Sequence, residues 1–263
     1  NTKRNYEVLV INDGSTDNTG KILDEFSRKN KGKLRVIHQK NAGVGITRNR
    51  LLEKSRGDVL ITLDSDDYLS ENALEKTMQS FYYNPKTDFV YSDHREVNEN
   101  NNVLGEARKS EVNKYFNDII FHCHFPGHMR AFRKDSIKGK KFNSELKYAE
   151  DYDFLLKTLV DKWPNHNTQH IPEILYNYRI NGKGLTSTLG ESTVPSKVVE
   201  NNLRQGDIYG TKNVKVYEDN GSRNFPAEKY NLPRFAHEVN GERKYMKYEA
   251  EKSLLNFIKN GGN

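Results

Sequence analysis

The chain has 263 residues, with 42 lysines and arginines against 36 aspartates and glutamates, a net charge of +6. Its length and its 11% aromatic content are sufficient for a globular core and exclude a disordered chain. No apolar stretch approaches the roughly 18–20 residues of a membrane-spanning helix, and the single cysteine excludes an intramolecular disulfide framework. The charge favours an anionic partner, although the basic residues are scattered as on an ordinary solvated surface.

The first third of the chain predicts alternating strands and helices. Strands are predicted by short apolar, β-branched runs at residues 8–12, 34–39 and 59–63. Helices are predicted by the spacing of apolar residues near residues 22–26 and over residues 47–54 and 70–82. Strands that alternate with helices indicate an α/β fold with a mixed, mostly parallel sheet and helices on both faces.

The rest of the chain is less regular. Further strands are expected at residues 89–92, 129–133 and 174–178, a polar hairpin tip at 99–106, and helices over 150–162 and 244–259. The last of these helices mixes basic and apolar residues, which is typical of a packed terminal helix and also compatible with a helix on a membrane surface. Because composition changes beyond Leu189, we expect one domain over residues 1–190 and a C-terminal extension, residues 191–263, packed on it.

Polar clusters follow each of the first three predicted strands. They begin at Asp13, at Asn41 and at Asp64. In open α/β sheets, ligands bind outside the carboxyl ends of the strands. We therefore expect the three clusters to border one binding site.

Asp64, Ser65 and Asp66 form the strongest candidate for chemistry. In an extended segment, residues i and i+2 point the same way, so Asp64 and Asp66 could both reach one hard cation. Mg²⁺ and Mn²⁺ prefer such oxygen ligands and keep coordination positions open for phosphate. The alternative is an Asp-rich turn that caps the next helix, for which Asp67 and Ser70 suffice.

Asp13 and the glycine-bearing loop at residues 41–49 favour a nucleotide. The Asp13 carboxylate can accept a hydrogen bond from a base or a ribose hydroxyl, or it can simply close a turn. The loop leads into a helix N-terminus, which favours phosphate. It half-matches a dinucleotide fingerprint, but Arg48 stands where a third glycine is needed, so Arg48 is better interpreted as a cation near phosphate or as a surface residue.

Glu150, Asp151 and Asp153 open a predicted helix. Acidic residues are common in a first turn because the helix dipole stabilises them. The same dipole keeps a carboxylate ionised at neutral pH, and an ionised carboxylate next to a sugar hydroxyl can act as a general base. The sequence leaves both interpretations open.

Three histidines and the single cysteine lie within residues 122–128. His122, Cys123 and His124 invite a zinc interpretation, but no second Cys–His pair is present to complete four-coordination. We expect these residues to line or underlie a cleft instead. A polar segment at residues 178–188, which includes Asn181, would by itself be an ordinary loop.

The order and spacing of these motifs resemble glycosyltransferase family 2 enzymes with the GT-A fold. The motifs are V-L-V-I-N-D-G-S-T-D-N-T (8–19), N-A-G-V-G-I-T-R-N (41–49), L-D-S-D-D-Y-L (63–69) and A-E-D-Y-D-F-L-L-K (149–157). Within the family, the stretches D-S-D-D-Y-L, H-C-H-F, I-L-Y-N-Y-R and T-S-T most resemble the second, glucuronosyl-transferring domain of bacterial chondroitin and hyaluronan polymerases. The resemblance implies a GT-A catalytic domain over residues 1–190.

The resemblance also implies roles for individual residues. Binding of the UDP-sugar is implied for Asp13, Ser15, Asn41, Gly43, Arg48, Asp64 and Ser65. Within this set, Asp13 would lie at the uracil or ribose and Arg48 near the diphosphate. Metal binding is implied for Asp64, Asp66 and Asn181, with Asp66 as the direct ligand of Mn²⁺ or Mg²⁺. The general base is implied to be Asp151, with Glu150 as the alternate.

Two departures from the family pattern stand out. Many members carry a histidine as a further metal ligand after the late Tyr–Arg strand, where this chain has Asn181. The family's first strand, which covers one face of the uridine, would precede Tyr6 and is absent from this sequence, so we expect an N-terminally incomplete catalytic domain.

The expected reaction is metal-dependent, inverting transfer of a sugar from a UDP-sugar to a hydroxyl of a glycan or another acceptor, in bacterial polysaccharide or glycoconjugate synthesis. We expect a cytoplasmic protein, since the single cysteine favours a reducing compartment. We also expect peripheral association with the inner face of the membrane, a place within a longer multidomain chain and no nucleic-acid partner. The sugar itself is left open between glucuronate, N-acetylhexosamine and glucose.

Two alternatives belong to other classes of protein. One is a catalytically degenerate UDP-sugar-binding domain of a larger polymerase. The other is a sugar nucleotidyltransferase, which should carry a glycine-rich basic loop early in the chain. No such loop is visible in the sequence.

Overall fold

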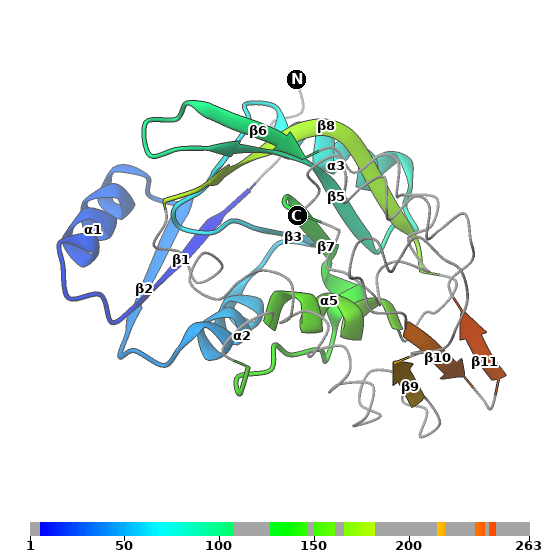
Figure 1. Cartoon of the computed structure of the whole chain (residues 1–263). Helices are drawn as coiled ribbons and strands as arrows, with labels where there is room; N and C mark the ends of the chain where they lie inside the picture. The colour runs from blue at the N-terminus through cyan, green and yellow to red at the C-terminus, as the bar shows by residue number, and fades with distance from the viewer. Residues whose placement is uncertain are drawn as a thin grey trace.

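The computed structural model describes residues 6–107, 127–146, 150–160 and 166–181, together with the backbone of three further strands between residues 215 and 245. The described residues form two sheets with helices packed around them and a small third sheet (Figure 1). The mixed α/β class predicted from the sequence is confirmed.

The first sheet consists of two parallel strands, β1 (Val8–Asp13) and β2 (Leu34–Gln39), joined by helix α1 (Thr19–Lys29). A parallel pair of strands needs a crossover connection, and α1 supplies it. The register pairs Asp13 with Gln39, so the two strands end side by side. The predictions for these three elements are confirmed.

The second sheet has six strands in the order β3–β7–β5–β8–β4, with β6 beside β5. The strands are β3 (Val59–Thr62), β4 (Tyr68–Leu69), β5 (Phe89–Val97), β6 (Val103–Ala107), β7 (Arg130–Arg133) and β8 (Thr168–Arg179). Strands β5 and β8 pair in parallel, whereas β3–β7, β5–β7, β4–β8 and β5–β6 are antiparallel. The sheet is mixed as predicted, but it is less parallel than expected because short turns, such as that between β5 and β6, join only antiparallel strands.

The remaining helices are α2 (Val44–Lys54), α3 (Ala73–Tyr83) and α5 (Glu150–Val160), and a short 3₁₀ helix, η2 (Lys134–Ile137), follows β7. Helix α3 forms because Ala73, Thr77 and Phe81 recur every fourth residue and are buried together. None of the described helices combines the length and the apolar character that crossing a bilayer requires.

Helices cover both faces of the second sheet. Helix α3 packs Phe81 against Val90 and Ala131, whereas α5 places the ring of Phe154 5.5 Å from that of Phe132. Ala131 and Phe132 are successive residues of β7, so their side chains point to opposite faces. The predicted helix cover on both faces is therefore confirmed for the described residues.

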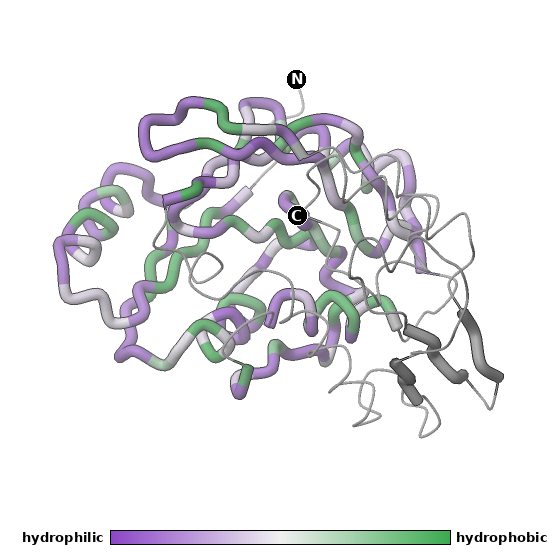
Figure 2. The backbone as a smooth tube through the Cα atoms, in the orientation of Figure 1, coloured by the Kyte–Doolittle hydropathy of each residue, from purple (hydrophilic) through white to green (hydrophobic). Residues whose placement is uncertain are grey.

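The hairpin of β5 and β6 turns at residues 98–102. Its outer part is rich in hydrophilic residues, whereas strands β1, β2 and β3 themselves contain many apolar residues (Figure 2). The prediction that residues 99–106 form a hairpin tip is wrong in length, since residues 103–107 form β6. Pairing with β5, including an ion pair between Arg95 and Glu106 (3.1 Å), stabilises a strand there, although polar stretches flank it on both sides in the sequence.

Three strands near the C-terminus form an antiparallel sheet: β9 (Lys215–Glu218), β10 (Phe235–Val239) and β11 (Glu242–Tyr245). The helix predicted from residue 244 is wrong at its first two residues, which lie in β11. Val239 pairs with Glu242, and the Asn-Gly dipeptide between them favours a hairpin. The rest of that predicted helix, the residues 122–125 and 186–188, and the packing of the extension on the core lie outside the described residues.

Candidate active site

Asp13 ends β1 and anchors the loop that leads into α2. Its Oδ1 accepts hydrogen bonds from Gln39 Nε2 (2.6 Å) and Ala42 N (2.8 Å), and its Oδ2 accepts one from Gly43 N (3.0 Å). Burial raises the pKa of Asp13, but these hydrogen bonds outweigh burial, so the net pKa is lowered and the carboxylate is ionised. Asn41 Nδ2 donates to the backbone carbonyl of Asp13 (3.1 Å). Two of the three predicted clusters therefore form one pair of loops.

Gly14 allows these two loops to approach closely. Its φ of +76° lies in the left-handed region, and a Cβ at this position would lie 2.6 Å from Asn41 N. Both the backbone conformation and the lack of space therefore require glycine. The next residue, Ser15, is exposed, and its N–H donates to Asn12 Oδ1 (3.0 Å).

Arg48 connects the second and third clusters. It projects from α2 and places Nη2 3.1 Å from Asp64 Oδ1 and Nη1 2.9 Å from Glu150 Oε1. Its guanidinium lies over the ring of Phe142, 5.6 Å from the centroid. Burial alone would lower the pKa of Arg48, but the charges of Asp151, Asp64 and Glu150 raise it. In this structure the cation predicted to lie near phosphate bridges two acidic segments.

Tyr176 of β8 holds the loop between β3 and β4 through hydrogen bonds of its hydroxyl group. Tyr176 Oη accepts a hydrogen bond from Asp64 N (3.2 Å) and donates one to Asp67 Oδ2 (2.7 Å). Asp67 Oδ1 accepts a hydrogen bond from Arg179 N (2.7 Å). Burial, together with the charges of Asp66 and Asp64, raises the pKa of Asp67 to about 6 against these hydrogen bonds. Asp67 is therefore turned inward as an anchor of the loop.

Asp66 and Asn181 lie together on the outer side of the same loop. Asn181 Nδ2 is 3.3 Å from Asp66 Oδ2, and Asp66 is exposed, as is its neighbour Ser65. The carboxylates of Asp64 and Asp66 and the amide oxygen of Asn181 are hard donors, which suit Mn²⁺ or Mg²⁺. No group of three or more His, Cys, Asp or Glu side chains that could hold a metal ion occurs in the described part of the chain. The chemistry of these three oxygen donors fits a cation that completes its coordination with oxygens from outside the protein, such as those of a diphosphate.

Glu150 and Asp151 begin α5 and have different surroundings. Glu150 is 7% exposed and paired with Arg48; its burial and the nearby charge of Asp151 raise its pKa. The Asp151 side chain is 24% exposed, and its Oδ2 lies 2.5 Å from Nη1 of Arg130, a buried residue of β7. Asp151 Oδ1 also accepts a hydrogen bond from Tyr152 N (2.8 Å). Each acidic residue is therefore held by its own arginine.

The structure brings most of the predicted residues into two connected groups. Arg48 joins Asp64 to Glu150, which places the end of β3 beside the start of α5. Asp13 belongs to the pair of loops before α2, and among the described residues no hydrogen bond or ion pair links it to Asp64 or Asp66. Helix α2, which carries Arg48, connects the two groups.

Sequence reasoning missed three residues of this region: Arg130, Tyr176 and Arg179. Tyr176 and Arg179 lie in the I-L-Y-N-Y-R stretch, where a tyrosine and a terminal arginine after two apolar residues are a usable signal. For Arg130, the only such signal is a charged residue within an otherwise apolar run. Its partner, Asp151, could not be identified from spacing because strand and helix meet only in the fold.

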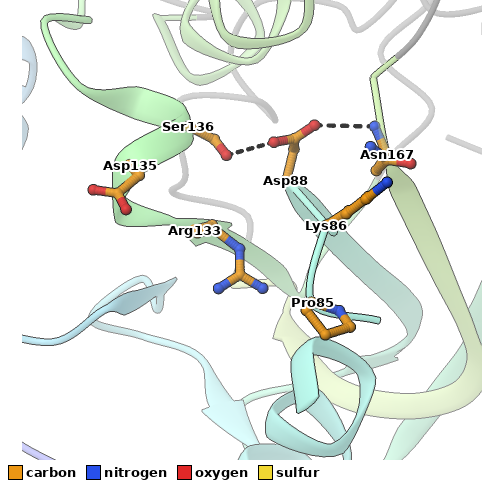
Figure 3. A pocket seen from close by; sticks show the side chains of 7 residues that line it. All are labelled: Pro85, Lys86, Asp88, Arg133, Asp135, Ser136 and Asn167. Atoms are coloured by element: carbon orange, nitrogen blue, oxygen red, sulfur yellow. Dashed lines mark hydrogen bonds between the residues drawn. The ribbon is translucent and has the colours of Figure 1, made fainter. Parts of the chain in front are cut away.

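A cavity of about 350 Å³ lies at the other end of the strands of the second sheet. It is lined by Pro85, Lys86, Asp88, Arg133, Asp135, Ser136 and Asn167. Arg133 pairs with Val59 at the start of β3, whereas the candidate site follows the end of β3. The Asp88 carboxylate accepts hydrogen bonds from Ser136 Oγ (2.6 Å) and Asn167 N (3.0 Å), as Figure 3 shows. This cavity is therefore separate from the acidic cluster.

The family model described as glycosyl transferase family 2 matches residues 1–139, more than half of the chain. The chain belongs to glycosyltransferase family 2.

Individual relatives agree with this assignment. A chondroitin synthase of Escherichia coli is 31% identical over 183 residues, which are 69% of this chain and 26% of the synthase. A hyaluronan synthase of Pasteurella multocida is 28% identical over 181 residues, 67% of this chain and 18% of that enzyme. The chain thus spans about a quarter or less of the length of these two relatives.

A solved structure supports the fold. The crystal structure of S. aureus TarS residues 1–349 in complex with UDP-GlcNAc matches with a TM-score of 0.55 and 20% identity, over 76% of this chain and 63% of that chain. At this level of identity the likeness concerns the fold alone. The GT-A fold expected from the resemblance is confirmed.

Proposed function

We propose that this chain transfers a sugar from a UDP-sugar to a hydroxyl of a glycan or another acceptor, with inversion at the anomeric carbon and with the help of Mn²⁺ or Mg²⁺. The observation that carries the proposal is the bridge of Arg48 between Asp64 and Glu150. The bridge holds the predicted donor-binding loop beside the start of α5, where Asp151, the predicted general base, follows Glu150. Such a reaction needs these two groups on the two sides of one anomeric carbon.

Asp151 is the better candidate for the base. Its side chain is more exposed than that of Glu150, at 24% against 10%, so it is more accessible to an acceptor hydroxyl. Its ion-pair partner is Arg130 and not Arg48, so it stands apart from the bridge to Asp64. Glu150 is committed to Arg48 and acts as an anchor. Asp151 would remove the proton of the acceptor hydroxyl as that oxygen attacks the anomeric carbon.

The donor side would be organised by the two loops that follow β1 and β2 and by the loop after β3. Asp13 and the backbone around Asn41 and Gly43 would receive the uridine, and Arg48 would lie near the diphosphate. Asp66, with Asp64 and Asn181 beside it, would hold the divalent cation. A bound cation supplies neutralisation of the charge that develops on the departing UDP. Fixed placement of donor and acceptor supplies much of the remaining acceleration.

Within the family, we assign the chain to the group of glucuronosyl-transferring domains of chondroitin and hyaluronan polymerases. The D-S-D-D-Y-L and I-L-Y-N-Y-R stretches support this assignment. It places the protein in bacterial polysaccharide synthesis, on the cytoplasmic side of the membrane and within a longer chain. Incubation with a panel of UDP-sugars and Mn²⁺, with release of UDP as the readout, tests it. UDP-glucuronate is expected to be the preferred donor, and preference for another sugar contradicts the assignment.

The role of Asp151 is tested by Asp151→Asn. We expect kcat to fall by about 10²–10⁴-fold, the usual contribution of a general base, with UDP affinity unchanged. Glu150→Gln is the comparison, since it removes the anchor rather than the base. Asp135→Asn, at the remote cavity, is the matched control and should behave as the wild type. Full activity of Asp151→Asn would move the assignment to Glu150.

The role of Asp66 is tested by Asp66→Ala. We expect titration calorimetry with UDP to show binding that is strengthened by Mn²⁺ and weakened by EDTA in the wild type, and to lose this difference in the variant. Unchanged metal-dependent binding in Asp66→Ala would remove Asp66 from the metal site.

A degenerate UDP-sugar-binding domain is the second candidate, and Asn181 at the position of a family histidine favours it. It predicts UDP binding without hydrolysis or transfer for any sugar in the panel. A sugar nucleotidyltransferase would release pyrophosphate rather than UDP, so the product distinguishes that class as well.

A further inference from the structure

Arg179, at the end of β8, reaches the loop that carries the predicted metal ligands. Its backbone N donates to Asp67 Oδ1 (2.7 Å), and its side-chain Nε donates to the backbone carbonyl of Asp66 (2.8 Å). The guanidinium also lies over the ring of Tyr68, 5.7 Å from the centroid. Arg179 therefore contacts three consecutive residues of the chain just after Ser65.

The other side of the same guanidinium is held by the turn between β5 and β6. Nη1 donates to the carbonyl oxygens of Asn98 (3.1 Å) and Glu99 (3.0 Å), and Nη2 donates to Asn101 Oδ1 (3.0 Å). Three oxygen acceptors within residues 98–101 thus bind the two terminal nitrogens of one guanidinium group. Only a planar guanidinium offers donors in the directions that two loops on opposite sides require.

The turn is preformed for this contact. Asn98 Oδ1 accepts hydrogen bonds from the N–H groups of Asn100 (2.9 Å) and Asn102 (2.9 Å), which fixes the loop from within. Asn101 has a φ of +62°, a conformation that asparagine tolerates better than most residues. This unusual conformation directs its side-chain oxygen to Arg179. The turn is thus held by its own hydrogen bonds as well as by those to Arg179.

We propose that Arg179 is a positioning residue that, braced by the β5–β6 turn, fixes the Asp64–Asp67 loop in the geometry that binds a divalent cation together with a nucleoside diphosphate. The inference rests on the proposed function, because it takes Asp66 as the metal ligand. Arg179 touches the carbonyl of Asp66 and not its carboxylate, so it acts through the backbone of the loop. Asn181, two residues further on, reaches that carboxylate, so the end of β8 holds Asp66 from both sides.

The test measures UDP affinity by titration calorimetry in MnCl₂ and in EDTA. Arg179→Lys keeps the charge but removes the fork, and we expect UDP affinity in Mn²⁺ to fall at least fivefold while affinity in EDTA changes by less than twofold. Asn101→Gly keeps the positive φ and removes one acceptor, so a loss of about two- to threefold is expected. Arg95→Lys is the matched control, because Arg95 pairs with Glu106 within the same hairpin and should leave both affinities unchanged.

The outcomes separate this inference from the proposed function. If wild-type UDP binding is insensitive to Mn²⁺, or if Asp66→Ala leaves it unchanged, the proposed function fails and this inference with it. If Asp66→Ala abolishes the Mn²⁺ effect while Arg179→Lys keeps it within twofold of the wild type, the inference alone is overturned. A purely structural role for Arg179 predicts equal losses of UDP affinity in Mn²⁺ and in EDTA. That result would also overturn the inference. Should Arg179→Lys fail to fold, Asn101→Gly decides the question. A two- to threefold loss of UDP affinity in Mn²⁺ with unchanged affinity in EDTA supports the inference, and no loss or equal losses overturn it.

Discussion

Burial of a single ionisable side chain changes when it takes up its proton. His166 lies just before β8, with Nδ1 2.8 Å from Thr168 Oγ1. Burial lowers the pKa of His166 to about 4, although the nearby charge of Asp88 acts in the opposite direction. The ring is therefore neutral in the folded chain at neutral pH and stays neutral well into the acidic range.

This shift predicts a loss of stability on acidification. An unfolded histidine takes up its proton near pH 6.5, whereas His166 in the folded chain does so only near pH 4. The contribution of His166 is thus fully present above pH 6.5 and is lost as the pH falls from 6.5 to 4, because the unfolded state then binds the extra proton. We expect a loss on the order of 2 kcal/mol between pH 7 and pH 4.5 in urea unfolding.

His166→Asn isolates this effect from other groups that titrate in the same range. The variant should show a smaller decrease in the free energy of unfolding over this pH interval than the wild type. His38→Gln is the control, since the His38 side chain is 44% exposed. Equal pH dependence in wild type and His166→Asn would contradict the prediction.

The acidic residues of the candidate site could be predicted from the sequence, whereas the groups that hold them could not. Asp64 and Asp66 stand out because they directly follow an apolar strand. Their partners, Arg48 and Asn181, lie 16 and 115 residues from them in the chain, and only the assembled fold brings them together. Local spacing identifies reactive residue types, and long-range packing determines which of them are neutralised.

At the scale of elements, prediction succeeded where one segment determines its own structure. The strands at the start of the chain and α5 follow from apolar runs and helical spacing. Strand β6 was missed because its five residues stand between polar stretches and form a strand through pairing with β5. Strand β4 was missed because two residues carry no periodic pattern. The antiparallel partners in the second sheet also escaped prediction, since pairing depends on residues far apart in the sequence.

Two glycines at equivalent positions of two helices predict opposite results. Gly45, the second residue of α2, is buried, and a Cβ there would lie 2.8 Å from Ser144 Cα. Gly20, the second residue of α1, would meet the side-chain nitrogen of Asn12 at 3.2 Å, which can move. We expect Gly45→Ala to lower the free energy of unfolding by about 1–3 kcal/mol, because backbone must shift.

Gly20→Ala should be near neutral, because better helix propensity offsets a mild contact. Urea unfolding of both variants measures the difference. Equal stability of the two variants would show that the segment at residues 143–144 yields without cost.

At the scale of the molecule, the residues proposed to bind the donor are divided between two sheets. Asp13 follows β1 in the first sheet, and Asp64 follows β3 in the second. Among the described strands, β1 pairs with β2 only and β3 with β7 only, so no strand pairing joins the two sheets. Helix α2 and its Arg48 connect them. A ligand that contacts both sheets should therefore stabilise the whole molecule.

We expect UDP with Mn²⁺ at about 100 times its dissociation constant to raise the free energy of unfolding by about 2.7 kcal/mol. Differential scanning calorimetry should show this as a rise in Tm of several degrees, and EDTA should reverse the part that depends on the metal. In Asp66→Ala the EDTA-sensitive part should disappear. A Tm that does not respond to UDP and Mn²⁺ together would contradict the proposed donor site.

The small size of the first sheet has a consequence for local dynamics. Asn12, at 8% exposed, is the one buried residue of β1 and β2, whereas the first six residues of β5 are all buried. Amide hydrogens of β1 and β2 should therefore exchange with deuterium well before those of β5 and β8, through opening events that leave the larger sheet intact. The loops proposed to bind uridine follow these two strands and would lie in the region that opens. Their protection from exchange would then report, peptide by peptide, whether a nucleotide is bound.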